Sequence, residues 1–114
     1  MNNIQRLEME TKGIQLDQSE LIIYLEENDL QPHQEYNAKS ATNKRNIYKS
    51  ALSVLESIAN SPETLKNIKS EELSVSDFAT NIQNRIDQLE YKIRMLKTDE
   101  QAQYNSNTFF LFDR

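Results

Sequence analysis

Two long stretches of this chain carry apolar residues at helical spacing. In residues 46–60 the apolar positions are three or four residues apart or adjacent: Ile47, Ala51, Val54, Leu55, Ile58 and Ala59. In residues 77–97 they step alternately by three and four: Ala79, Ile82, Ile86, Leu89, Ile93 and Leu96. Residues at such spacing share one face of an α-helix. The pattern therefore predicts two long amphipathic helices.

The second stretch has the spacing of heptad a and d positions. A coiled coil normally continues for three to four heptads or more, and this seam is shorter. Packing of residues 77–97 against the helix of residues 46–60 is therefore favoured over an isolated parallel coiled coil. Ser74, or alternatively Ser76, is the expected N-cap of this helix.

Shorter apolar patterns predict two helices near the N-terminus. Residues 3–12 form the first, with Asn2 or Asn3 as cap and Gly13 at the C′ position. Residues 17–28 form the second. Its expected N-cap is Asp17, which with Glu20 resembles a capping box. The second helix ends before Pro32.

The middle of the chain is less regular. The polar residues 37–46 are compatible with a loop or a solvated helix, and Tyr36 is a candidate anchor in front of them. Pro62 suits the first turn of a short helix over residues 62–67, capped by Ser61. Residues 69–76 are expected to form a loop that inserts Leu73 and Val75 into the core.

Composition agrees with a helical chain. One Gly and two Pro in 114 residues are too few for a fold rich in tight turns. We expect an all-α fold, a small helical bundle with two long helices, short N-terminal helices and an extended C-terminal tail. Residues 1–98 form the helical domain in this prediction, and residues 99–114 form the tail.

The tail has an unusual pattern, because a polar stretch over residues 99–107 precedes an aromatic cluster. The cluster consists of Phe109, Phe110, Leu111 and Phe112. It can cap the chain's own core, pair as a strand with the sheet edge of a partner, or aggregate. The polar spacer separates the cluster from the core, so we favour docking onto a partner.

Charge is distributed unevenly along the chain. The net charge is -5, but residues 1–36 carry two basic and eight acidic side chains, whereas residues 37–60 carry four basic and one acidic. Solvated faces account for such a pattern, and so does pairing between copies or with a partner. Glu26 and Glu27 on one side and Lys44 and Arg45 on the other are the candidate contacts between subunits.

Few residues point to catalysis or metal binding. His33 is the one histidine and there is no cysteine, so a zinc site would depend on carboxylates. One glycine cannot form a phosphate-binding loop. We therefore predict no enzyme and no cofactor. The pI near 4.9 argues against a general DNA-binding protein. The absence of an apolar run of about 18 residues or of a signal peptide predicts no membrane contact and a cytoplasmic protein.

Three segments resemble small head–tail connector proteins of tailed bacteriophages. Residues 46–60 (NIYKSALSVLESIAN) resemble their main helix, residues 73–89 (LSVSDFATNIQNRIDQL) their loop and final helix, and residues 21–30 (LIIYLEENDL) their early helix. The resemblance covers about residues 15–97. It rests on packing patterns rather than on catalytic motifs.

The resemblance implies a structural virion protein without enzymatic activity. Such connectors form a ring, typically of twelve copies, below the portal, extend the DNA channel and carry the next neck or tail component. It also implies assembly in the host cytoplasm, a final location in the virion neck, passage of DNA without sequence specificity, and a C-terminal segment that reaches the portal or a neighbouring subunit. The alternative from another class is a small antitoxin-like regulatory protein that docks on its target through the aromatic tail.

Overall fold

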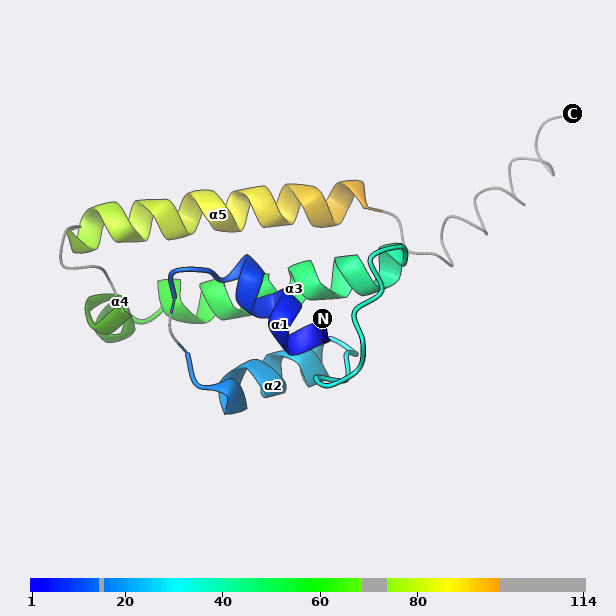
Figure 1. Ribbon diagram of the computed structural model, residues 1–114. Helices are drawn as coiled ribbons and strands as arrows, with labels where there is room; N and C mark the ends of the chain where they lie inside the picture. The colour runs from blue at the N-terminus through cyan, green and yellow to red at the C-terminus, as the bar shows by residue number, and fades with distance from the viewer. Residues whose placement is uncertain (15, 69–73, 97–114) are drawn as a thin grey trace, which may run out of the picture.

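The computed structural model describes residues 1–14, 16–68 and 74–96. These residues form a helical bundle (Figure 1). The helices are, in order, α1 (Asn3–Glu10), α2 (Gln18–Glu27), α3 (Ala41–Ala59), α4 (Pro62–Ile68) and α5 (Val75–Met95). The predicted all-α bundle with two long helices is confirmed. The predicted tail, residues 99–114, lies outside the described residues.

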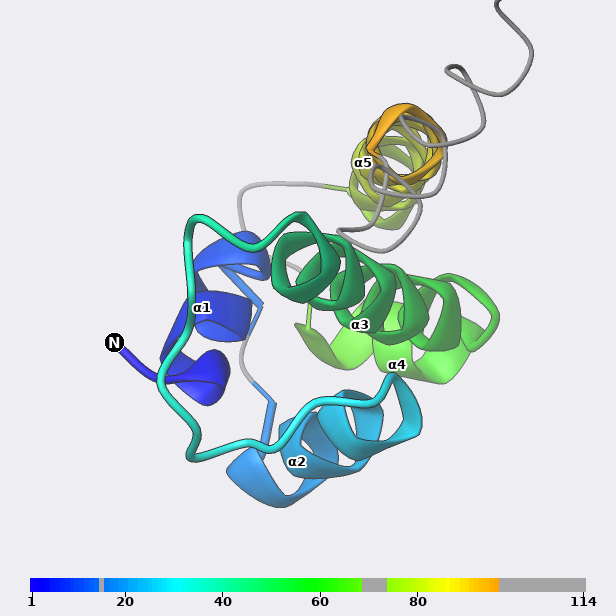
Figure 2. The ribbon, with the colours of Figure 1, turned by 90° about the vertical axis from the view of Figure 1, so that its right-hand side faces the viewer.

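Helix α3 is the centre of the bundle. It contacts each of the four other helices. The view along its axis shows α5 on one side of α3 and α1 and α2 on the other (Figure 2). Helices α3 and α5 run antiparallel, so the beginning of α3 lies beside the end of α5 (Figure 1). The prediction that the seam of α5 packs on α3 is confirmed.

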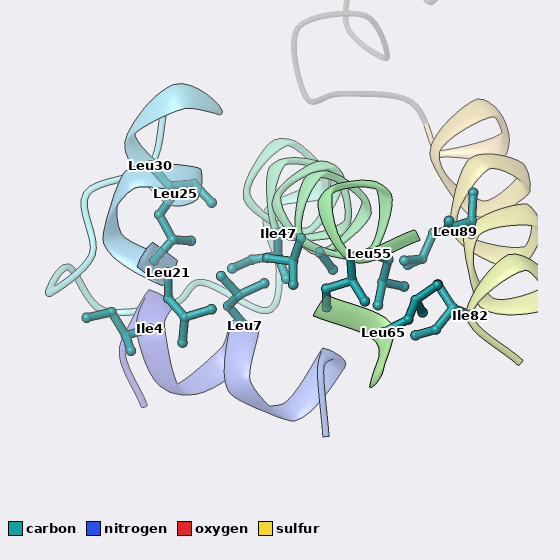
Figure 3. Packing of buried hydrophobic residues seen from close by; sticks show 14 of the residues in the cluster. Ile4, Leu7, Leu21, Leu25, Leu30, Ile47, Leu55, Leu65, Ile82 and Leu89 are labelled. Atoms are coloured by element: carbon teal, nitrogen blue, oxygen red, sulfur yellow. The ribbon is translucent and has the colours of Figure 1, made fainter. Parts of the chain in front are cut away.

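The core follows the apolar spacing of the sequence. Leu7, Leu25, Ile47 and Leu89 are each fully buried, and they come from four different helices. Figure 3 shows Leu55 of α3 close to Leu65 and Ile82, at the junction of α3, α4 and α5. The sequence pattern missed Phe78, which is also buried. Phe78 lies one position before Ala79, the first residue of the heptad seam, and it belongs to the same core cluster as Leu65 of α4.

The start of α1 is fixed by a capping box. Asn2 Oδ1 accepts a hydrogen bond of 3.0 Å from the Gln5 backbone N–H, and Gln5 Oε1 accepts one of 2.9 Å from the Asn2 N–H. Asn2 is therefore the cap. Asn3 is buried instead, and its Nδ2 donates to the Gln31 carbonyl at 2.8 Å. The helix ends at Glu10 with Thr11 as C-cap, so the C′ position is Lys12. Gly13, which was predicted at C′, has φ 92° and lies one residue further along the chain.

The two ends of α2 differ in how they are capped. Asp17 is the N-cap residue, but its side chain makes no capping hydrogen bond, so the predicted capping-box role is wrong. Its carboxylate is exposed, and hydration competes there with a bond to the backbone. At the other end Asp29 takes φ 63°, and the Leu30 N–H donates to the Leu25 carbonyl at 2.9 Å. This Schellman arrangement buries Leu30 and directs the chain away from α2.

Serine caps define the remaining helix starts. Ser40 Oγ accepts from the Asn43 N–H at 3.1 Å, so residues 41–46 are helical and the open question about residues 37–46 is settled. Ser61 Oγ accepts from the Thr64 N–H at 3.3 Å. Ser74 Oγ accepts from the Asp77 N–H at 3.0 Å, which makes Ser74, not Ser76, the cap of α5.

Helix α5 begins at Val75, inside the stretch of residues 69–76 that was predicted to be a loop. Val75 is partly buried against the core, but it belongs to the first turn of α5 rather than to a loop. Leu73 lies outside the described residues. Tyr36, the expected anchor before α3, does pack against the core.

Truncating the α3–α5 contact should destabilise the bundle. Leu55 and Leu89 are 1% and 0% exposed. We expect Leu55→Ala and Leu89→Ala each to lower the free energy of unfolding by about 2–5 kcal/mol, because each leaves a cavity in a packed core. Chemical denaturation followed by circular dichroism measures this. Asn84→Ala, on the exposed face of α5, is the control and should cause no loss. A change near zero for either leucine would contradict the packing described here.

Candidate functional site

The predicted anchor, Phe109, Phe110, Leu111 and Phe112, lies outside the described residues. The described residues carry two surfaces of opposite charge, and these include the other predicted site residues. They are built on α2 and on the paired ends of α3 and α5.

The first surface, called here the acidic face, is on α2. Ile23 is 55% exposed, although most isoleucines are buried. Glu20, Glu26 and Glu27 lie three or four residues from it and therefore surround it on the helix surface. All three are exposed, and none forms an ion pair with another described residue. An apolar side chain ringed by carboxylates is thus open to solvent.

A groove runs beside the acidic face, between α2, the second half of α3 and the start of α4. Its volume is about 550 Å³. The apolar lining comes from Leu16, Ile23, Val54 and Ile58, and Glu20 and Glu27 also line it. Val54 and Ile58 are almost fully buried and belong to the core, so they form the floor. The groove can accept an apolar side chain that is flanked by positive charge.

The second surface, called here the basic end, is where α3 begins and α5 ends. It comprises five cations: Lys44, Arg45, Lys49, Lys92 and Arg94. The antiparallel arrangement places the start of α3 and the end of α5 at the same end of the bundle, and the Lys92 Nζ lies 5.4 Å from the centroid of the Tyr48 ring. None of them forms an ion pair within the described residues. The Arg45 Nε is buried and has no hydrogen-bond partner in the part of the chain that the structure describes.

The last turns of α5 also expose apolar side chains. Tyr91 and Met95 are 57% and 62% exposed, and their spacing of four residues places them on one face. The Arg94 guanidinium lies 6.0 Å from the centroid of the Tyr91 ring. This part of the basic end therefore combines exposed apolar surface with cations that have no ionic partner among the described residues.

Within one molecule the two surfaces do not meet. Glu26 and Glu27 are on α2, and Lys44 and Arg45 are at the start of α3, where no ion pair joins them among the described residues. Helices α2 and α5 lie on opposite sides of α3 (Figure 2). The predicted charge contacts are thus not made within the described part of one chain.

A third cluster, which the sequence did not reveal, joins α1 to α5. Glu10 accepts from Arg6 at 2.9 Å and also forms an ion pair with Arg85. The Arg6 guanidinium lies 5.3 Å from the Tyr36 ring centroid and 6.0 Å from that of Tyr48. Partial burial alone lowers the pKa of Arg6, but hydrogen bonds and charge attraction from Glu10 and Tyr36 outweigh it and raise the pKa above its ordinary value.

Arg6 and Glu10 are four residues apart, which is the spacing of an ordinary ion pair on a helix. This spacing was the one feature of the sequence that could have indicated the cluster. The long-range partner, Arg85, is separated from Glu10 by 75 residues. Because the three charged side chains are mostly covered, we assign the cluster to linking the end of α1 with α5 rather than to binding a ligand.

Outside these surfaces, the side chains that could take part in catalysis or metal binding are not clustered in the described part of the chain. His33 is exposed. In residues 1–14, 16–68 and 74–96 no three His, Cys, Asp or Glu side chains gather closely enough to hold a metal ion. A second hollow of about 610 Å³ lies between the end of α1 and the start of α2, with Glu8 and Asp17 in its lining. No helix in the described ranges has the length and apolar character to cross a membrane.

Removing the central charge of the α1–α5 cluster should weaken the fold. Glu10→Gln leaves Arg6 and Arg85 facing each other without a carboxylate, and we expect the free energy of unfolding to fall by about 1–3 kcal/mol. Thermal or chemical denaturation measures the loss. Glu8→Gln on the same helix is the matched control, since Glu8 is exposed and forms no ion pair with a described residue. Equal stability of both variants would contradict the proposed role.

No family model, no curated protein and no solved structure matches this chain.

Proposed function

We propose that this chain is a structural subunit of the neck of a tailed bacteriophage, a head–tail connector that forms a ring on the portal. In this role it extends the DNA channel, joins the capsid to the next neck or tail component and catalyses no reaction. It assembles in the host cytoplasm and remains in the virion.

The separation of charge on the bundle carries this proposal. The acidic face is on α2, the α5 part of the basic end lies on the opposite side of α3, and neither surface has an ionic partner among the described residues. A molecule with two complementary but different surfaces is suited to repeat head to tail, and such repetition closes into a ring when the rotation between copies permits it. The resemblance of residues 15–97 to connectors, which form rings, agrees with this.

Residues 108–114, which contain the aromatic cluster and are called here the aromatic segment, supply the attachment to the portal in this proposal. Phe109, Phe110 and Phe112 follow a polar spacer, and the last described residue, Leu96, lies at the basic end of the bundle. Residues 97–108 can span up to about 40 Å when extended, at about 3.3–3.6 Å per residue. The segment can therefore reach a surface well outside its own bundle.

A role as DNA conduit is compatible with the overall charge. The chain carries a net charge of -5, so a ring of copies is strongly negative. Like charges repel, and DNA passing through such a ring is not retained by it. Contact with DNA in this role does not depend on base sequence.

Deleting the aromatic segment tests the attachment. A chain that ends at Asn107 should fold with unchanged stability and lose its binding to portal rings of the same phage, because the apolar anchor is gone. Co-sedimentation with purified portal measures binding, and circular dichroism checks the fold. Portal binding equal to that of the full chain would show that the anchor is elsewhere.

A matched pair of substitutions separates the anchor from the spacer. Phe110→Asp should reduce portal binding by about tenfold or more, since it places a charge in a buried apolar contact. Asn107→Asp adds the same charge three residues earlier and should leave binding unchanged. If both variants bind equally well, the aromatic side chains are not the anchor.

A further inference from the structure

Exposed apolar side chains occur on both charged surfaces. Among the described residues the large hydrophobic side chains with more than half their surface exposed are Met1, Met9, Ile23, Tyr91 and Met95. Ile23 lies within the acidic face, and Tyr91 and Met95 lie within the basic end. Ile23 has Glu20, Glu26 and Glu27 around it, and Tyr91 and Met95 have Lys92 and Arg94 beside them, with the acidic Asp87 and Glu90 on the preceding turn of α5. Each surface thus combines exposed apolar side chains with charge, which is a common composition of a protein–protein contact.

We propose that the acidic face of one copy binds the C-terminal turns of α5 in a second copy. Tyr91 and Met95 enter the groove beside Ile23, and Lys92 and Arg94 approach the carboxylates of Glu20, Glu26 and Glu27. This inference rests on the proposed function for the closure of a ring, whereas the contact itself requires two copies of this chain and no portal.

The groove fits this occupant in size and chemistry. Its volume of about 550 Å³ exceeds that of single side chains, and Leu16, Val54 and Ile58 offer an apolar lining. Tyr91 and Met95 project from one helix face four residues apart, so both can enter together. Burial of Ile23, Tyr91 and Met95 removes three exposed apolar side chains from water at once.

The two surfaces cannot pair within one chain. The groove is bordered by Val54, Ser57 and Ile58 of α3, whereas the basic end lies beside Tyr48. Lys44 and Ser57 are separated by about 20 Å along α3, at 1.5 Å per residue. In addition, α2 and α5 lie on opposite sides of α3 (Figure 2). The partner of each surface is therefore a different molecule.

Charge favours a second copy over the aromatic segment as the occupant of the groove. Residues 108–114 contain one acidic and one basic side chain, Asp113 and Arg114, and so offer no net positive charge to the three glutamates. The end of α5 offers Lys92 and Arg94, neither of which has an ionic partner among the described residues. A second copy also presents both complementary surfaces in equal numbers. Because the two surfaces differ, the contact is head to tail.

Self-association of the full chain is the direct test. We expect the purified protein at millimolar concentration to form species larger than dimers in about 0.01 M salt, where the Debye length is about 30 Å, and to dissociate in about 1 M salt, where it is about 3 Å. Sedimentation equilibrium measures both. A monomer under the first condition, or an assembly that stops at two copies, would overturn the head-to-tail contact.

Charge reversal identifies the surfaces. Glu27→Arg and Arg94→Glu should each raise the dissociation constant by about tenfold or more. An equimolar mixture of the two variants should associate like the wild type, because each retains one native surface and the altered surfaces complement each other. Glu8→Arg and Lys66→Glu, which make the same charge changes outside both surfaces, should have no effect. Failure of the mixture to associate would refute the pairing, provided that circular dichroism shows both variants folded.

The chain that ends at Asn107 distinguishes the two occupants of the groove. It should self-associate like the full chain, and a loss of association would show that the aromatic segment occupies the groove. Normal self-association without portal binding by the full chain would contradict the proposed function and leave this contact intact.

Discussion

The burial of α3 determines the arrangement of the whole bundle. Its apolar residues cover a broad arc that includes Ile47, Val54 and Leu55, and a single neighbouring helix cannot cover such an arc. Helices α1 and α2 cover one part and α5 covers the other. Each of these helices has one buried stripe, so each must leave its opposite face in solvent. The outward faces of α2 and α5 are therefore a consequence of how α3 is buried.

The same constraint explains where charge accumulates. The basic residues of α3 are near its start, and those of α5 include Lys92 and Arg94 near its end. Because the two helices are antiparallel, these groups lie at the same end of the bundle. The carboxylates of α2 are held on the other side of α3. A charge asymmetry along the sequence thus becomes an asymmetry in space.

Periodicity in the sequence was sufficient to predict the fold and most of the core. The seam of α5 identified Ile82, Ile86 and Leu89 as buried, and it left Tyr91 and Met95 on the opposite face. Residues 21–25 are a continuous apolar run, so their spacing could not show that Ile23 is the exposed member. Which residue of this run is exposed depends on the side of α2 against which α3 packs.

Helix ends and long-range polar contacts were harder to predict. Several side chains can cap each helix start, and local sequence does not decide between Asn2 and Asn3 or between Ser74 and Ser76. Tertiary contacts decide, since Asn3 is needed to bind the Gln31 carbonyl and the Asn43 side chain. The pairing of Glu10 with Arg85 likewise depends on the path of the chain through α3 and α4. Such contacts follow from the fold and cannot be read from residue spacing.

The proposed assembly places different demands on its two kinds of contact. A head-to-tail surface can form open chains as well as rings, so a strong contact between free subunits carries a risk of uncontrolled growth. The apolar part of the proposed contact consists of a few side chains, and the rest is charge that salt screens, so the contact is weak in isolation. A separate anchor to a template raises the effective concentration of neighbouring copies and makes weak contacts sufficient. In the proposed assembly, two modest attachments, one between copies and one to the template, would therefore confine ring formation to the template.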